Sequence, residues 1–235
     1  MRWLANVTLA DLFTLMNGIL GFVAITYIVD RRIPYASVLI CAAILMDGLD
    51  GYFARRAGMR RSIGRYLDSI SDSVSFCIAP ALLLYTLYYD PEKGRAWTSS
   101  QNALAVLSAV AFASCGILRL ARFTAKHHSK DYFVGLPTPA AAFGVLSLTY
   151  LFGGISLFEP YLATLSGIAI ALLMVSEIPY PKLRGMLVPF GALAVLLGAI
   201  TPLVPGLPAL SPLPLALFLC YAIGGPIYEK RCRSG

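Results

Sequence analysis

Long runs of apolar residues alternate along the whole chain with short stretches that are polar or rich in proline. A helix needs about 20 apolar residues to cross the hydrocarbon core of a bilayer, and it satisfies its own backbone hydrogen bonds there. The pattern therefore predicts an all-α, polytopic membrane protein of about eight transmembrane helices, with residues 1–235 forming a single integral-membrane domain. The expected spans are 9–29, 34–54, 66–89, 102–124, 137–157, 160–178, 184–204 and 207–228.

The composition favours a membrane protein over a soluble one. Hydrophobic residues make up 58% of the chain and charged residues 13%, whereas soluble domains are about 45–50% apolar and about 25% charged. This difference excludes a disordered protein, a coiled coil and an ordinary soluble enzyme. The five cysteines have no CxxC spacing and four of them lie within apolar runs, so we expect neither a disulfide framework nor a zinc site.

The basic residues predict the orientation in the membrane. The net charge is +7, which in a soluble protein would suggest nucleic acid, but the aromatic residues lie within apolar runs and we expect no nucleic-acid partner. With eight spans and both termini on one side, 15 of the 19 Lys and Arg residues fall on that side. The positive-inside rule assigns such a side to the cytoplasm. We therefore expect a multi-pass protein of the cell membrane with both termini cytoplasmic.

Four aspartates lie close to the ends of two predicted spans. Asp47 and Asp50 are three residues apart near the cytoplasmic end of the second span, and Asp68 and Asp72 are four apart in the first turns of the third. Each spacing places its pair on one face of a helix. A short linker makes the two helices antiparallel neighbours, so all four carboxylates can converge. Clustered like charges repel, and two divalent cations (Mg²⁺, Mn²⁺ or Ca²⁺) would offset them while leaving positions open for phosphate oxygens.

The four aspartates also fit two roles that involve no metal. They could pair with nearby arginines in a structural network, or serve an ion or proton transporter, because intramembrane acids also occur in proton relays. Neither alternative accounts for the small residues Gly48, Gly51, Ala54 and Gly64, which would let a ligand approach the backbone closely. The combination favours a nucleotide lying across the helices, with Arg55 in reach of a diphosphate.

The same segment carries a family signature. Its positions along the chain are Asp47, Asp50, Gly51, Ala54, Arg55, Gly64, Asp68 and Asp72. Their identity and spacing resemble the signature of the CDP-alcohol phosphotransferase family at all eight defining positions. The resemblance implies a six-helix core over about residues 8–185, two additional C-terminal spans at about 184–228, a bound CDP-linked lipid and two divalent cations.

The resemblance also implies a role for each of these residues. Asp47, Asp50 and Asp68 would be metal ligands, and Asp72 would be both a metal ligand and the catalytic general base. The residues expected to contact the CDP-linked lipid are Gly51, Ala54, Arg55, Gly64 and Asn17.

Four further segments, 12–18, 118–123, 133–142 and 174–180, resemble the phosphatidylserine synthase branch of that family. The resemblance implies a transferase of phospholipid biosynthesis. It would move a phosphatidyl or archaetidyl group from CDP-diacylglycerol or CDP-archaeol to the hydroxyl of L-serine and release CMP. Glycerol phosphate and inositol phosphate remain alternative acceptors. The resemblance further implies a homodimer among membrane lipids, with its active site on the cytoplasmic side.

A small group of residues outside the signature could bind the acceptor or a phosphate. Arg119 and Arg122 lie three apart at the cytoplasmic end of the fourth span, and arginine binds carboxylate or phosphate in bidentate fashion. The alternative is that both simply anchor the span at the cytoplasmic surface. Thr138 is a further candidate contact, and Lys182 either faces the lipid phosphate or anchors its loop.

Overall fold

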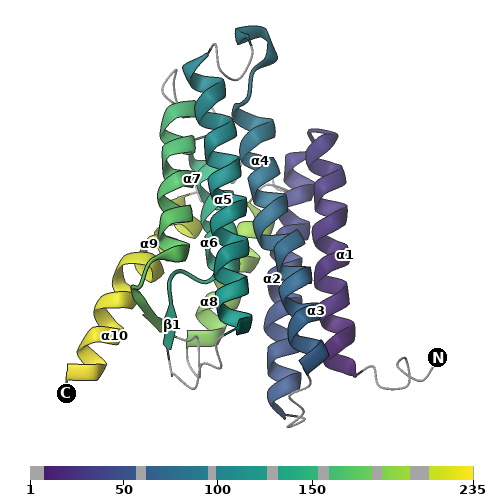
Figure 1. The fold of residues 1–235 in the computed structure, drawn as a ribbon, viewed down its shortest axis with the longest axis vertical. Coiled ribbons are helices and arrows are strands. Elements are labelled where there is room, and N and C mark those ends of the chain that lie inside the picture. The colour runs from purple at the N-terminus through teal and green to yellow at the C-terminus, as the bar shows by residue number, and fades with distance from the viewer. Residues whose placement is uncertain are drawn as a thin grey trace.

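The computed structural model describes residues 8–56, 62–94, 99–125, 132–152, 159–181, 187–201 and 212–234. Within these residues the chain is a bundle of helices with one small β-ribbon (Figure 1). The helices are α1 (Leu9–Val29), α2 (Ile33–Arg56), α3 (Ser62–Asp72), α4 (Ala79–Tyr88), α5 (Ser100–Ala125), α6 (Thr138–Phe152), α7 (Glu159–Val175), α8 (Leu187–Ile200), α9 (Pro212–Leu219) and α10 (Gly225–Ser234). A π-helical segment, Ser73–Ile78, joins α3 to α4, and another, Cys220–Gly224, joins α9 to α10.

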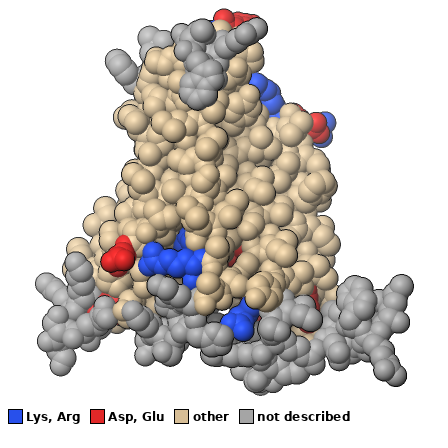
Figure 2. Space-filling model, in the orientation of Figure 1, with Lys and Arg blue, Asp and Glu red and all other residues tan. Residues whose placement is uncertain are grey.

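The helices confirm the predicted class of all-α, polytopic membrane protein. Four stretches are long and apolar enough to cross a membrane: Leu9–Val29, Ile33–Phe53, Gly64–Tyr88 and Ser100–Ala125. Three shorter apolar helices follow, at Thr138–Leu151, Pro160–Val175 and Gly191–Ile200. The central part of the face in Figure 2 carries almost no charged side chain, and charged residues lie towards the two ends of the bundle. This distribution is expected where lipid tails surround the middle of a protein.

The first helix shows how the sequence sets an element's start and end. Thr8 and Asp11 form a reciprocal cap, in which the Asp11 amide donates to Thr8 Oγ1 (3.3 Å) and the Thr8 amide donates to Asp11 Oδ2 (2.8 Å). Such capping boxes satisfy free amides at a helix start. At the other end Arg31 has a φ of 55° and lies between α1 and α2. The short connection makes α1 and α2 closely packed neighbours.

The β-ribbon is a feature that the hydrophobic pattern did not predict. Strand β1 (Tyr132–Val134) pairs antiparallel with β2 (Pro179–Pro181), close to the lower end of the bundle in Figure 1. The span predicted at 160–178 is therefore too long, because α7 ends at Val175 and the chain then turns into β2. Gly135 follows β1 with a φ of +80°, and a Cβ there would lie 2.2 Å from the Met174 carbonyl oxygen. Only glycine fits both the conformation and the contact.

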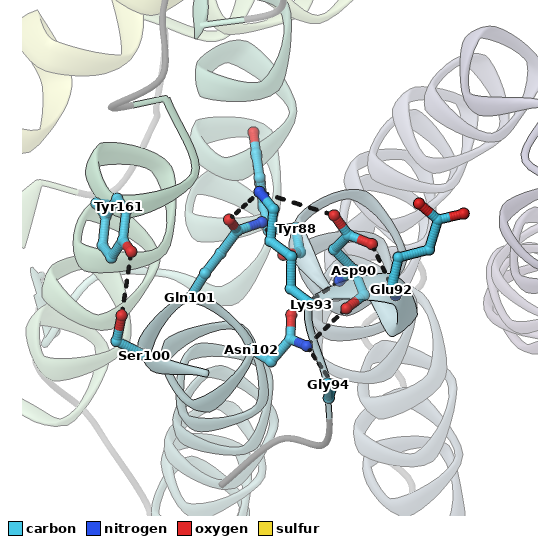
Figure 3. Close-up of polar contacts among 9 residues, drawn as sticks. All are labelled: Tyr88, Asp90, Glu92, Lys93, Gly94, Ser100, Gln101, Asn102 and Tyr161. Atoms are coloured by element: carbon cyan, nitrogen blue, oxygen red, sulfur yellow. Dashed lines mark hydrogen bonds and ion pairs between the residues drawn. The ribbon is translucent and has the colours of Figure 1, made fainter. Parts of the chain in front are cut away.

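The two ends of the bundle differ in what they bring together. The start of α1, the end of α2, the start of α3 and α10 all lie at the lower end in Figure 1, whereas the connection from α4 to α5 lies at the upper end. At that upper end the buried Asn102 side chain accepts from the Asp90 amide (2.9 Å) and donates to the carbonyl oxygens of Asp90 (2.6 Å) and Gly94 (2.8 Å) (Figure 3). Gln101 donates to the Tyr88 carbonyl oxygen and accepts from Lys93. This network fixes the α4–α5 connection far from the aspartates.

Candidate functional site

Three of the four predicted aspartates come together at the lower end of the bundle. One carboxylate oxygen each from Asp47, Asp50 and Asp68 lie within 4.8 Å of one another. Divalent cations bind carboxylate oxygens at about 2.0–2.6 Å, so oxygens on either side of one ion lie about 4–5 Å apart. The three carboxylates could hold a single cation, and oxygen-only ligands suit Mg²⁺, Mn²⁺ or Ca²⁺. The cluster could therefore bind a divalent metal.

The helices that carry these aspartates meet in a different way from the one that the sequence indicated. Two antiparallel neighbours, α2 and α3, were expected to bring the carboxylates together directly. Instead direct contacts between α2 and α3 are sparse, and α1 packs against both of them. The acids converge as predicted, but a third helix brings their two helices into position.

Asp72 lies one helical turn beyond Asp68 and is only 6% exposed. Its Oδ1 accepts a hydrogen bond of 2.8 Å from Asn17 Nδ2. It is close enough to interact electrostatically with Asp47, Asp50 and Asp68, yet it does not belong to the group of three that could share one ion. The structure thus separates one aspartate from the cluster of three and gives it a hydrogen-bonding partner of its own.

Helix α1 contributes two polar side chains to this site. Asn17 was expected to contact the CDP-linked lipid; it is fully buried, donates to Asp72, and has no partner for its Oδ1 among the described residues. Thr14, which the sequence reasoning missed, donates from Oγ1 to Asp50 Oδ2 at 2.8 Å. The signal was present in the sequence, because two polar residues three apart in an apolar span share one helix face.

A buried arginine approaches the aspartates from α5. Arg119 is 8% exposed, interacts electrostatically with Asp72 and Asp47, and donates from Nη1 to Thr138 Oγ1 (3.2 Å). Its guanidinium carbon lies 5.9 Å from the centroid of the Phe133 ring. Its Nε has no partner among the described residues. A buried cation beside carboxylates, with a free donor, can bind an anionic group of a ligand.

Arg122 and Thr138 differ in what they contact. Arg122 donates from Nη1 to the Val175 carbonyl oxygen over 3.4 Å, which links the end of α5 to the end of α7. Arg122 therefore reaches the end of α7, whereas the Thr138 hydroxyl is buried beside Arg119.

The remaining predicted site residues lie in part outside the described structure. A Cβ on Gly48 would have no atom of the described residues within 4 Å, and a Cβ on Gly64 would be in ordinary contact with Asp11 at 3.4 Å. Gly51 is half-buried one residue after Asp50. The side chains of Ala54 and Arg55 and the whole of Lys182 lie outside the described residues.

Membrane-crossing helices and a carboxylate cluster that fits a divalent cation at one end define an integral-membrane protein with a metal-competent site. Comparison with known proteins then gives the family. The family model for CDP-alcohol phosphatidyltransferase matches residues 7–197, and the chain belongs to this family.

Curated relatives place the chain in one branch of the family. It is 40% identical over 177 residues to the CDP-diacylglycerol–serine O-phosphatidyltransferase of Methanocaldococcus jannaschii, covering 75% of each chain. It is 34% identical over 182 residues to the archaetidylserine synthase of Methanothermobacter thermautotrophicus, covering 77% of this chain and 72% of that one. A Bacillus subtilis CDP-diacylglycerol–serine O-phosphatidyltransferase is 30% identical over 175 residues, with 74% and 89% covered. These matches confirm the predicted family and its serine-using branch.

Proposed function

We propose that this protein transfers the phosphatidyl group, or its ether-lipid counterpart, from a CDP-linked lipid to the hydroxyl of L-serine. In the reaction the serine oxygen forms a bond to the lipid-side phosphorus, the bond from that phosphorus to the CMP phosphate breaks, and CMP leaves. The observation that carries the proposal is the juxtaposition of three metal-competent carboxylates, a separate buried aspartate and a buried arginine. The names of the relatives supply the acceptor.

The cluster of three carboxylates defines the end of the site that binds the diphosphate. Asp47, Asp50 and Asp68 would hold the divalent cations, with Asp72 as a further ligand to the second of two. Bound cations would neutralise the diphosphate and stabilise the charge that develops on the departing CMP. Gly51, Gly64, Ala54 and Arg55 would contact the CDP part of the lipid, as the resemblance of these positions to the family signature implies. The free Asn17 Oδ1 is available to a donor on the same ligand.

Asp72 would accept the proton of the serine hydroxyl as the bond to phosphorus forms. A general base must lie within hydrogen-bond reach of the proton that it removes. Asp72 fits this task because Asn17 holds one of its oxygens at 2.8 Å, which leaves the other oxygen to face the substrate.

The acceptor would lie between Asp72 and Arg119. Serine carries a carboxylate, which glycerol phosphate and inositol phosphate lack, and the buried guanidinium with its free Nε would bind it. Thr138 fixes that guanidinium through Nη1. We assign Lys182 and Arg122 to the lipid phosphate or the surface around it.

The orientation and the assembly complete the proposal. The aspartate site, the start of α1 and α10 share one end of the bundle (Figure 1), and the excess of basic residues on that side favours a cytoplasmic location. The whole chain would act as one membrane domain within a homodimer.

The deciding experiment supplies radiolabelled L-serine to the purified protein with CDP-diacylglycerol and CDP-archaeol in parallel, each with and without EDTA. We expect a labelled phospholipid and stoichiometric CMP, both lost in EDTA and restored by excess Mn²⁺ or Mg²⁺. The comparison of the two lipids identifies the tail chemistry. A product formed with glycerol phosphate or inositol phosphate but not with serine would refute the proposed acceptor, and activity that survives complete removal of metal would refute the proposed role of the aspartates.

A further inference from the structure

Thr14 and Asn17 are the polar residues of α1 that face the aspartates. Thr14 is 4% exposed and Asn17 is 0% exposed, and their spacing places them on one face of the helix. We propose that both are positioning residues: Thr14 holds the Asp50 carboxylate in the orientation that a divalent cation requires, and Asn17 holds the Asp72 carboxylate in the orientation that receives the proton of serine. The second part rests on the proposed function, and the first concerns the metal site alone.

Each of these two hydrogen bonds restrains a carboxylate but occupies only one of its lone-pair sites. Thr14 Oγ1 lies 2.8 Å from Asp50 Oδ2, and Asn17 Nδ2 lies 2.8 Å from Asp72 Oδ1. A carboxylate offers two oxygens with about four lone-pair sites, so one accepted hydrogen bond leaves room for a cation or a substrate proton. Hydrogen bonds to ionised acceptors are also shorter and stronger than neutral ones. The two donors therefore restrain the orientation of each carboxylate through one of its oxygens.

The position of α1 itself is fixed at this level of the bundle. Ser75, in the π-helical segment just after Asp72, donates from Oγ to the Asn17 carbonyl oxygen at 2.8 Å. A Cβ on Gly21 would lie 2.2 Å from Ser75 Oγ and 2.6 Å from its Cα, and a Cβ on Gly18 would lie 3.0 Å from Ser71 Oγ. The two glycines let α1 approach the segment that carries Asp72. Because α1 also packs along α2, it can align acids on two helices that barely touch.

Burial alone does not explain these contacts. A buried hydroxyl needs one partner, and the Ala10 carbonyl oxygen, 3.0 Å from Thr14 Oγ1, could be that partner. The hydroxyl has a single proton and can donate it instead to Asp50 Oδ2 at the shorter distance of 2.8 Å, so burial alone does not require the contact with Asp50. It places a donor against one of the three carboxylates that could bind a cation, as the supporting groups around metal ligands commonly do.

The test uses Thr14→Val and Asn17→Leu, which remove the donors at nearly constant size, and Asn17→Asp, which replaces the amide donor with an acceptor when the new carboxyl is ionised. Thr26→Val is the matched control, because Thr26 is exposed on the same helix and its hydroxyl donates to the Val23 carbonyl oxygen. Mn²⁺ binding to the purified protein without CDP-lipid is measured by electron paramagnetic resonance. Release of CMP with serine is measured separately over a range of Mn²⁺ concentrations.

The Thr14 and Asn17 variants should fail in different ways. Thr14→Val should weaken Mn²⁺ binding about 10- to 100-fold, and its activity should recover at high Mn²⁺, whereas Thr14→Ser should restore binding. The Asn17 variants should lose about 10- to 100-fold in kcat, and the loss should persist at saturating Mn²⁺ because a cation bound to Asp72 would not replace the hydrogen bond from Asn17 that orients its carboxylate. Thr26→Val should match the wild type in both measurements.

Each outcome decides one part of the proposal. If Thr14→Val binds Mn²⁺ as Thr26→Val does, Thr14 does not position a metal ligand. If either Asn17 variant elutes as the folded protein and keeps the wild-type kcat, Asn17 does not position the base; two variants are used so that misfolding of one leaves the other. A wild-type protein that binds Mn²⁺ but releases no CMP with serine would contradict the proposed function instead, and the Mn²⁺ measurement on Thr14→Val would still test the metal part.

Discussion

Replacement of Arg119 should raise the KM for serine far more than it lowers kcat. Arg119 is buried beside Asp72, its Nη1 is held by Thr138, and its Nε is free among the described residues, so a serine carboxylate would meet a guanidinium that is already oriented. A hydrogen bond to a charged group contributes about 1.5–3 kcal/mol, and about 1.4 kcal/mol corresponds to a tenfold change in an equilibrium constant. Arg119→Gln should therefore raise the KM about 10- to 150-fold.

The size of the effect should depend on geometry as well as charge. Arg119→Lys keeps the charge but loses the planar fork that matches a carboxylate, so its KM should lie between those of the wild type and Arg119→Gln. Arg122→Gln is the matched control on the same helix, because Arg122 reaches the Val175 carbonyl oxygen over 3.4 Å. Its KM for serine should change little.

An acceptor without the carboxylate separates this role from general damage to the site. L-serinamide carries the same hydroxyl and amine but a neutral amide. The wild type should use it poorly, and Arg119→Gln should use it about as well as the wild type does, because the lost contact is missing in both. The KM is obtained from CMP release at varied acceptor concentration, for the wild type and Arg119→Gln, each with serine and with L-serinamide. If Arg119→Gln keeps the wild-type KM for serine, the serine carboxylate is bound elsewhere. The same conclusion follows if the substitution raises the KM for serine and the KM for L-serinamide by the same factor.

Three further predictions concern single positions. Asp72→Asn should abolish CMP release while the protein elutes and melts like the wild type, because the amide cannot accept the serine proton; full activity would show that another base acts. Gly135→Ala should lower the Tm, since a side chain at positive φ costs about 1–2 kcal/mol and the new Cβ would meet the Met174 carbonyl oxygen at 2.2 Å. Gly224→Ala should not lower it, because no atom of the described part of the chain lies within 4 Å of the new Cβ. Asn102→Ala should also lower the Tm, because buried groups left without partners cost about 1–3 kcal/mol, yet leave the KM for serine unchanged, since the network of Figure 3 lies at the opposite end of the bundle.

The sequence predicted the parts of the fold that depend on local patterns. Apolar runs of about 20 residues identified the four long membrane helices, because a span's length and polarity are set by the bilayer alone. The sequence did not predict the β-ribbon, because strands of three residues are too short to show an alternation of apolar and polar positions. In addition, β2 begins and ends with proline (Pro179 and Pro181). What makes the ribbon is a long-range pairing that no local spacing indicates.

The difference between local spacing and long-range contacts also explains how much of the site could be predicted from the sequence. Asp47 with Asp50, and Asp68 with Asp72, were recognisable because each pair repeats at a helical spacing, and three of the four do form a cluster that fits a cation. The hydrogen-bond donors to these acids come from much farther away, 36 residues before Asp50 and 55 before Asp72. Arg119 was a candidate, but its burial against Phe133 and Thr138 depended on how α5 meets the ribbon.

The π-helical segment Ser73–Ile78 links the position of the base to the packing of α1. It begins directly after Asp72, and one extra residue in a helical turn rotates every later side chain relative to those before it. Asp72 on one side of this junction and Ser75 within it both contact Asn17, one through its side-chain amide and the other through its carbonyl oxygen. Asn17 of α1 thus forms hydrogen bonds on both sides of the junction where α3 changes to the π-helical segment. A shift of α1 along the bundle would displace both the Asp72 carboxylate and the segment around Ser75, because Asn17 is hydrogen-bonded to each. The alignment of the base therefore depends on how α1 packs, although none of the eight signature positions lies on α1.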